Sequence, residues 1–583
     1  MQRFSLRWIA FCWISLAANW CAQSADADGI QIDFLLNREP EVSPQPIKWV
    51  LHPELLSLWR QALARPESEL KRQAAEAIVT AHRLGHDEML TTVPELLKVL
   101  SDEMVHPAAR YAAAHALIVL DNRESAAKLL EASQSGGKDL RLLIEPALAH
   151  WSYDPILPVW RQRLASPKGP RRELALAIEG LGIRRDAESL EPLLALALAK
   201  GNSGDIRLAA ARAAGHVADH GLEKQAEQLA GQSILDRLCA AALIARHRSE
   251  QAIKLDQSLG ADVEPTVAGA ALRSLYAIDP NLVVPLLNST LQNADANIRR
   301  IGIETGLTLP TVERVQLLSA LLNDPHPGLR SQVRDGFFAL SKTQELEGVI
   351  RQSTVAVLGG DDWRGQEQGA MLLGALDEER AAPRLLELLD APRAEVAIAS
   401  AWALKSLSVP ATAAPVRDFV QRQTASEELV TPRRDHQVAH LMELLGTLKD
   451  AAAIPVLEIY IPKTDRYGVN SRACAIWALG VIQEGQPNER LAKKLMERYV
   501  DTNSLPPEVF EVRRAAVLTL GRLRAKSQLA SLKQFLGEAV DQELMELSIR
   551  WALQQNSDDS LPVVGPVQLE RRGWFLEPGL SNR

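Results

Sequence analysis

Residues 322–340 read LNDPHPGLRSQVRDGFFAL. Asp324, Pro325 and Pro327 are suited to end one helix and start the next, because proline fits a first helical turn but breaks a helix interior. After Pro327, small and apolar residues recur at intervals of three and four, which is the period of a helix and not of a strand. The stretch therefore predicts the turn and the second helix of a helix pair.

The same pattern recurs along the chain. Variants of it are LSDEMVHPAARYAAAHALIVL at 100–120, LASPKGPRRELALAIEGLG at 164–182, LQNADANIRRIGIETGLTL at 291–309 and LLDAPRAEVAIASAWALKSL at 388–407. A leucine near the end of each expected second helix serves as a ruler, at Leu307, Leu340, Leu373, Leu404, Leu445, Leu479, Leu520 and Leu553. Repeats with the spacing of these leucines indicate stacked helix pairs that share one continuous core.

These repeats resemble HEAT repeats, and the shorter units are similar to the subtype found in phycobilin lyases. The resemblance covers about residues 52–555. It implies an all-α fold, a right-handed α-solenoid of about fourteen stacked helix pairs with the armadillo-type superhelix. It implies little about activity, because one fold hosts many unrelated functions.

The first 27 residues have the three parts of an export signal. Arg3 and Arg7 precede an apolar run over 8–18, and small residues follow. The run is too short to cross about 30 Å of hydrocarbon, so we expect a cleavable signal peptide and no membrane span in the mature chain. The expected location is therefore periplasmic or extracellular.

Two cleavage frames fit the signal, one after Ser24 and one after Ala27. A lipid anchor on Cys21 is an alternative, although the bulky Trp20 stands where small residues are expected. We expect residues 28–51 and 556–583 to be irregular extensions that cover the end repeats, because terminal layers of a repeat array need a shielded outer face. Trp574 and Phe575 would then pack on the last helix pair.

The net charge, the cysteine positions and the missing motifs exclude several classes of function. With 65 Lys and Arg against 73 Asp and Glu, the formal net charge is −8, which is not the basic footprint of a nucleic-acid binder. Cys239 and Cys474 lie too far apart in a repeat array for a disulfide. The chain also lacks CxxC, HExxH, GxSxG and Walker motifs, so we assign no catalytic residue, no metal and no cofactor.

Histidine pairs four residues apart are the remaining candidates for metal ligands, because that spacing puts two imidazoles on one helix face. The pairs are His82 with His86, His216 with His220, and His436 with His440. A metal site needs further ligands nearby, and the sequence supplies none next to these pairs except Asp435. We expect them to be structural.

Arginine stands ten residues before the ruler position in several units, at Arg110, Arg171, Arg207 and Arg330. We expect a ladder in which each arginine pairs with Asp or with backbone carbonyls of adjacent repeats. An anion-binding groove is the alternative.

Four turns inside helix pairs of the C-terminal half are enlarged, at 359–366, 421–434, 462–470 and 500–508. In a solenoid they should follow one edge, and insertions on one face of a repeat array often mark a binding face. Their aromatic and arginine residues belong to the types enriched in interface hot spots. The predicted partner-binding residues are Trp363, Arg364, Arg433, Arg434, Arg466 and Tyr467.

Three second helices carry a Trp-Ala-Leu tripeptide, which begins at Trp402, Trp477 and Trp551. We expect these indoles to fill gaps beside alanine, and an aromatic stripe that receives a peptide or glycan is the alternative. The sequence as a whole predicts an exported, non-catalytic scaffold that binds a protein or peptide partner. The alternative is an enzyme or a chromophore or cofactor chaperone of the bilin-lyase type.

Overall fold

The computed structural model describes residues 29–42, 48–166, 169–428, 430–536, 543–555, 568–571 and 573–575. Throughout this part of the chain the architecture is helical, with one short two-stranded sheet. The chain divides into two compact units. An N-terminal unit comprises 45–305 and 564–583, and a C-terminal unit comprises 1–44 and 306–563, with the boundary inside helix α18.

Each unit is built from helix pairs, which confirms the all-α solenoid of HEAT-like repeats. The first helices of the pairs in the N-terminal unit are α3 (Pro53–Ala64), α5 (Val93–Ser101), α7 (Ala126–Ser135), α9 (Leu157–Ala165), α11 (Leu190–Leu198), α13 (Glu223–Ala230), α15 (Glu250–Gly260) and α17 (Leu287–Leu291). The second helices are α4 (Ser68–Arg83), α6 (Pro107–Val119), α8 (Lys138–His150), α10 (Arg171–Arg184), α12 (Gly204–Val217), α14 (Ile234–Ile244), α16 (Pro265–Ile278) and α18 (Ala296–Thr308).

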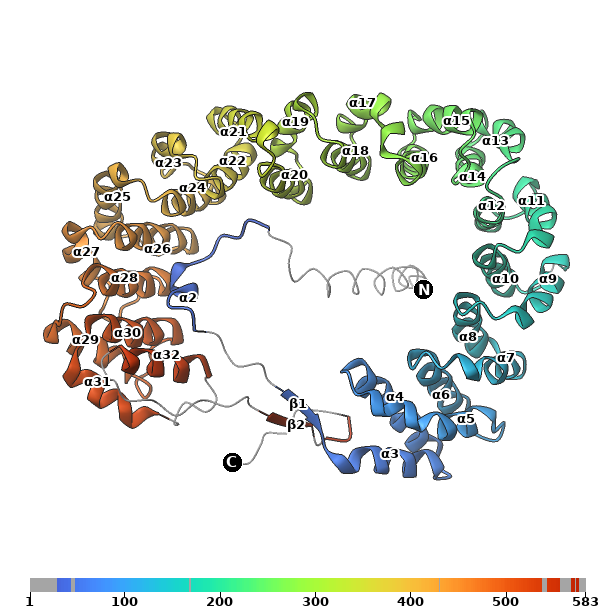
Figure 1. Ribbon diagram of the computed structural model, residues 1–583, viewed down its shortest axis with the longest axis horizontal. Helices are drawn as coiled ribbons and strands as arrows, with labels where there is room; N and C mark the ends of the chain where they lie inside the picture. The colour runs from blue at the N-terminus through green and yellow to red at the C-terminus, as the bar shows by residue number, and fades with distance from the viewer. Residues whose placement is uncertain are drawn as a thin grey trace. The chain divides into compact units, whose positions relative to one another are not determined.

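The C-terminal unit continues the same alternation. Its first helices are α19 (Val312–Ser319), α21 (Gln344–Gly359), α23 (Ala382–Leu388), α25 (Ala413–Ala425), α27 (Ile454–Glu458), α29 (Glu489–Tyr499) and α31 (Lys526–Leu532). Its second helices are α20 (Pro327–Leu340), α22 (Trp363–Ala375), α24 (Ala394–Leu407), α26 (Pro432–Thr447), α28 (Val469–Ile482), α30 (Phe510–Leu523) and α32 (Glu543–Gln554). Within this unit the second helices form one row and the first helices another (Figure 1).

Small residues set the distance between neighbouring second helices. A Cβ placed on Gly374 would lie 2.8 Å from the Cα of Ala403, and one on Gly446 would lie 2.9 Å from the Cα of Ala478. Real Cβ atoms do not approach so closely, so glycine is required where α22 meets α24 and where α26 meets α28. These glycines therefore let α22 pack directly on α24 and α26 directly on α28.

The predicted arginine ladder is confirmed at Arg171, Arg207 and Arg330, and the guanidinium of Arg330 lies 3.7 Å from Glu367 of the following repeat. Arg171 pairs with Asp205 of the following repeat, and Arg207 lies 2.5 Å from Asp236 in the same way. The Nε atoms of Arg110 and Arg207 also donate to carbonyl oxygens ten residues upstream, at 3.0 Å in both cases. Arg171 and Arg207 thus orient one layer on the next, whereas the bond from Arg110 to Leu100 joins the two helices of one pair. Neither contact needs a ligand.

The two ends of the array carry strands that the sequence did not predict. β1 (Lys48–Leu51) pairs in parallel with β2 (Gln568–Arg571), with Lys48 opposite Gln568. This pairing brings the C-terminal tail to the N-terminal unit, where Trp574 packs against the hydrophobic core. The prediction that Trp574 and Phe575 lie on the last helix pair was wrong, because β2 holds the tail at the start of the array. Phe575 remains 54% exposed.

The expected signal peptide, residues 1–27, lies outside the described residues. Among the residues that the structure describes, no helix combines the length and the apolar character needed to cross a bilayer.

Candidate functional site on the second helices of the C-terminal unit

Residues 29–41, which we call the N-terminal segment, lie across the second helices of the C-terminal unit. The segment is extended except for one helical turn, α2 (Leu35–Arg38), which packs against α28 (Figure 1). Leu36 stands 407 positions before its hydrogen-bond partner Glu443. The segment therefore occupies this surface as a peptide ligand would, and it does not cover the first helix pair as expected for an N-terminal cap.

Four consecutive second helices hold the main chain of the segment. Lys405 Nζ of α24 donates to the carbonyl of Asp33, and Glu443 Oε1 of α26 accepts from the amide of Leu36 at 3.0 Å. Trp477 Nε1 of α28 donates to the carbonyl of Glu39 at 3.1 Å. On α30, Arg514 donates to the carbonyl of Leu36 at 2.8 Å, and Arg522 donates to the carbonyl of Glu39 at 3.3 Å. Contacts to backbone groups fix the register of an extended peptide. We call these five side chains, with His436 and His440, the segment site.

Two apolar side chains anchor the segment. The ring of Phe34 stacks on His440 with centroids 4.5 Å apart and meets the edge of His436 at 5.8 Å. Leu36 is 4% exposed. The histidine pair on α26 thus forms an aromatic slot. Among the described residues, no group of three or more His, Cys, Asp or Glu side chains is arranged to hold a metal ion.

A buried charge pair lies beneath the slot. Glu443 is fully buried, with its Oε2 3.3 Å from Lys405 Nζ and 3.9 Å from Nδ1 of His440. Burial would raise the pKa of Glu443, but His440, Lys405 and the amide of Leu36 outweigh it and hold the pKa below the ordinary value. Burial lowers the pKa of His440. Glu443 is therefore an ionised acceptor at neutral pH, and its bond to the Leu36 amide is charge-assisted.

Two arginines of α30 complete the segment site. Burial lowers the pKa of Arg514, which donates to the carbonyl of Leu36 and at 3.3 Å to the hydroxyl of Ser548. Burial also lowers the pKa of Arg522 to about 10, and its guanidinium lies 5.1 Å from the ring centroid of Trp477. Both cations direct their hydrogen bonds at neutral acceptors, so they depend on the segment to compensate their lost hydration.

The tryptophans combine the two roles that the sequence left open. The ring edges of Trp402 and Trp477 lie against Gly374 and Gly446 of the preceding second helices, which is the expected packing role. Trp477 also donates its indole N–H to the carbonyl of Glu39, so at this position the stripe contacts an extended segment of the chain itself.

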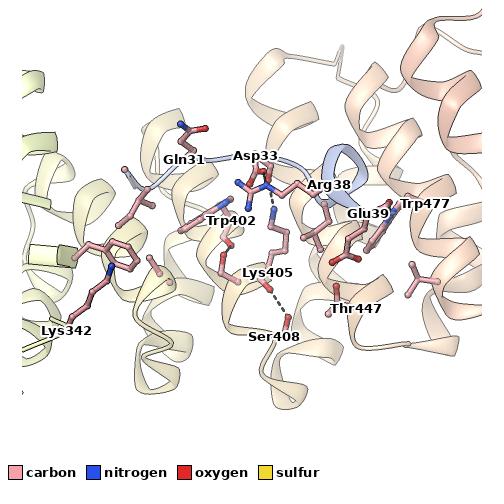
Figure 2. A pocket seen from close by; sticks show the side chains of 18 residues that line it. Gln31, Asp33, Arg38, Glu39, Lys342, Trp402, Lys405, Ser408, Thr447 and Trp477 are labelled. Carbon is pink, nitrogen blue, oxygen red and sulfur yellow. Dashed lines mark hydrogen bonds and ion pairs between the residues drawn. The ribbon is translucent and has the colours of Figure 1, made fainter. Parts of the chain in front are cut away.

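A pocket of about 700 Å³ remains beside the segment (Figure 2). Gln31 and Leu35 border it from the segment, while Trp402, Trp477 and Lys405 border it from the helices. The segment therefore leaves part of the surface of the second helices beside it uncovered.

The edge residues predicted from the sequence brace neighbouring turns. Arg433 donates at 3.0 Å to the carbonyl of Pro392 in the preceding repeat, and Arg466 donates at 3.3 Å to the carbonyl of Thr424. Lys463 reaches forward to Asp501 at 3.1 Å. These contacts link the turns in series, so the enlarged turns do follow one edge of the C-terminal unit.

The first of these turns is shorter than predicted. Asp362 caps α22 by accepting a hydrogen bond from the amide of Arg364 at 2.9 Å, so 363–366 is already helical. Trp363 lies between three guanidinium groups, with Arg393, Arg364 and Arg330 at 4.8, 4.9 and 5.5 Å from its ring centroid. Its ring is therefore partly covered by neighbouring cations.

Arg433 and Arg434 stand at the start of α26, which begins at Pro432 within the predicted turn, whereas Arg466 and Tyr467 lie in the turn before α28. Arg434 donates at 3.2 Å to the hydroxyl of Ser426, and Arg466 lies 3.5 Å from the carbonyl of the same residue. Tyr467 packs on Tyr460 with ring centroids 4.2 Å apart. The assignment of these residues to partner binding stays a prediction.

The sequence reasoning missed most of the segment site. Trp402, Glu443 and Trp477 each stand two positions before a ruler leucine, so they occupy one line along the second helices. That phase was a usable signal. Nothing in the sequence marked Phe34 and Leu36 as the residues that would lie on this line.

The comparisons with known proteins agree with the fold. No family model matches the sequence, and no curated protein matches it. A structure titled for the binding of Kap95p to RanGDP matches with a TM-score of 0.52 at 15% identity, covering 86% of this chain and 72% of that chain. A Kap95–Nup1 complex matches with a TM-score of 0.50 at 14% identity over the same shares. Kap95p is yeast importin-β. At this identity the likeness shows a shared HEAT-repeat solenoid fold and nothing more.

Proposed function

We propose that this chain is an exported, non-catalytic HEAT-repeat scaffold that binds an extended segment of a protein partner at the segment site. The observation that carries the proposal is the set of hydrogen bonds from four consecutive second helices to the main chain of residues 33–39. A surface that holds backbone groups accepts many sequences in one register, which suits a peptide-binding scaffold. The export of the protein rests on the pattern of residues 1–27.

The fold is compatible with this role. The neighbouring Kap95 structures contain a protein partner by their own descriptions, RanGDP in one and Nup1 in the other. The predicted edge residues Trp363, Arg364, Arg433, Arg434, Arg466 and Tyr467 are proposed as a second contact surface for the body of the same partner.

A peptide library tests the proposal. The full chain carrying Phe34→Ala and Leu36→Ala, which we call the segment variant, would be panned against random peptides longer than the segment. Adding Trp477→Phe and Arg514→Met removes two donors while keeping most of the packed volume. The enriched peptides should lose about tenfold or more in affinity, which corresponds to about 1.4 kcal/mol.

The control for these donor substitutions makes the same chemical changes in the N-terminal unit. Trp59→Phe and Arg110→Met replace a buried indole and a buried arginine that donates to a carbonyl. Affinity for the enriched peptides should be unchanged. If the enriched peptides bind equally well without the two donors, the segment site is not the interface.

A further inference from the structure

We infer that the partner's segment carries an aromatic residue followed two positions later by an aliphatic residue other than proline, and that residues 29–41 compete with it from within the chain. This inference rests on the proposed function and specifies its ligand. The proposed ligand of the segment site is thus an apolar stretch of another protein. Its aromatic and aliphatic residues would take the places of Phe34 and Leu36.

The aromatic requirement comes from the slot on α26. Phe34 is held by one stacked and one edge-on imidazole, at 4.5 and 5.8 Å between centroids. His440 is 1% exposed and stacks on the Phe34 ring with an interplanar angle of 26°, so this position presents the flat face of a buried imidazole. An aromatic ring satisfies the geometry and the apolar surroundings together.

The second requirement comes from Glu443. Its Oε1 accepts the amide hydrogen of Leu36 at 3.0 Å, and the Leu36 side chain is 4% exposed. A proline at this position has no amide hydrogen and would leave a buried carboxylate without that donor. The position therefore selects an aliphatic side chain on a residue that can donate.

The competition follows from the unfilled pocket. About 700 Å³ lies between the segment and the second helices, bordered by Gln31, Leu35, Trp402 and Trp477. Phe338 also lines the pocket and is only half-buried, so a partner with a bulky apolar residue in place of Gln31 would cover more of this apolar lining than the internal segment does, and would gain affinity from that burial.

Covalent attachment, in contrast, favours binding of the internal segment over binding of a partner. A tethered peptide acts at an effective concentration that reaches the millimolar range. A partner must therefore bind more tightly than the internal segment does before it can displace it. The incomplete fit of residues 29–41 keeps this threshold within reach.

A direct binding assay tests the inference. A labelled peptide of residues 29–41 would be titrated by fluorescence anisotropy into the wild-type chain and into the segment variant. The segment variant should bind at least about tenfold more tightly than wild type, because its own segment no longer competes. Peptides with Phe34→Ala or Leu36→Pro should bind at least about tenfold more weakly, and a peptide with Gln31→Trp should bind more tightly than the native one.

Several outcomes would overturn the inference. They are equal binding by wild type and the segment variant, equal binding of a scrambled peptide, and undiminished binding of the Leu36→Pro peptide. Heterodimers on mixing wild type with the segment variant would mean that the occupant is a second copy of this chain. If the double alanine change alters the helical circular dichroism, Leu36→Pro in the full chain replaces it.

The library experiment separates the two proposals. Donor-dependent peptides without an aromatic residue followed by an aliphatic one at the second position would refute this inference and leave the proposed function standing. A library without any donor-dependent peptide would refute both.

Discussion

Glu443 accepts the amide hydrogen of Leu36 at 3.0 Å while its second carboxylate oxygen lies 3.3 Å from Lys405 Nζ. One buried carboxylate thus joins the N-terminal segment to an ion pair between α24 and α26. The segment site is consequently both a binding surface and a part of the core of the C-terminal unit, and the two roles predict different consequences of mutation.

Glu443→Gln should destabilise the C-terminal unit. The amide of glutamine still accepts from Leu36, but Lys405, which is 5% exposed, loses its buried counter-ion. Removing one partner of a buried pair costs about 3–5 kcal/mol. Urea unfolding at neutral pH measures the effect, with Glu250→Gln as the control because Glu250 pairs with Lys254 at the exposed surface. Equal stability of the two variants would show that the pair contributes nothing.

Asp256 of α15 should make the N-terminal unit less stable as the pH rises. Burial raises the pKa of this carboxyl to about 8, and within the described part of the chain no hydrogen-bond partner reaches its Oδ1. The folded state keeps its proton, whereas the unfolded state releases it near pH 4. The free energy of unfolding therefore falls by up to about 1.4 kcal/mol per pH unit between about pH 4 and 8, and then levels off.

Asp256→Asn removes the group that titrates and should flatten this dependence. Thermal melts across the pH range test the change, with Asp139→Asn as an exposed control in the same unit. A wild-type slope that survives in the Asp256→Asn variant would contradict the assignment.

Gly446→Ala should destabilise the protein and disturb the segment. The new Cβ would lie 2.9 Å from the Cα of Ala478 and 3.0 Å from a ring carbon of Trp477, so α28 and the indole must move. Overpacking of this kind costs about 1–3 kcal/mol. Gly348→Ala in α21 is the control, since nothing lies within 4 Å of its added Cβ. Helix propensity should make that variant up to about 1 kcal/mol more stable, and chemical denaturation should show opposite signs for the two changes.

Replacing Trp363, Arg433, Arg434 and Tyr467 with alanine should leave the helical circular dichroism intact while loosening the turns. Arg433 and Arg434 donate to backbone carbonyls of residues 391, 392 and 428, so limited proteolysis should cut faster at 426–431. Binding of the 29–41 peptide should stay within about twofold. Binding of a folded partner should be lost, as expected for a second contact surface, and undiminished capture of that partner would exclude the edge from the interface.

The repeat architecture was predictable because the local sequence of each unit specifies its own helix pair. The ruler leucines recur along the array, and counterparts of Pro327 and Arg330 recur in several layers, so each stretch specifies a helix pair from its own local sequence. The arginine ladder was predictable for the same reason. The turn at 360–362 was misjudged because Asp362 is an efficient N-cap and starts α22 earlier than the polar residues around it suggest.

The segment site was not predictable in the same way. Phe34 and Leu36 carry no repeat signature, and their partners lie some 400 positions further along the chain. Glu443 looks like an ordinary helix residue until the segment and Lys405 bury it. The pairing of β1 with β2 was hidden for the same reason, because neither short strand could have been matched to the other from local sequence.

The distance along the chain between the segment and its binding helices also constrains the order of synthesis. Phe34 and Leu36 leave the ribosome long before Arg522, which lies 483 positions after the Glu39 carbonyl that it binds. Until α26 and α28 have been made, these two apolar side chains lack the helices they pack against, and such long-range contacts form slowly. A chain that lacks these helices therefore exposes Phe34 and Leu36 to chaperones and proteases, whereas the complete protein packs both side chains against its second helices.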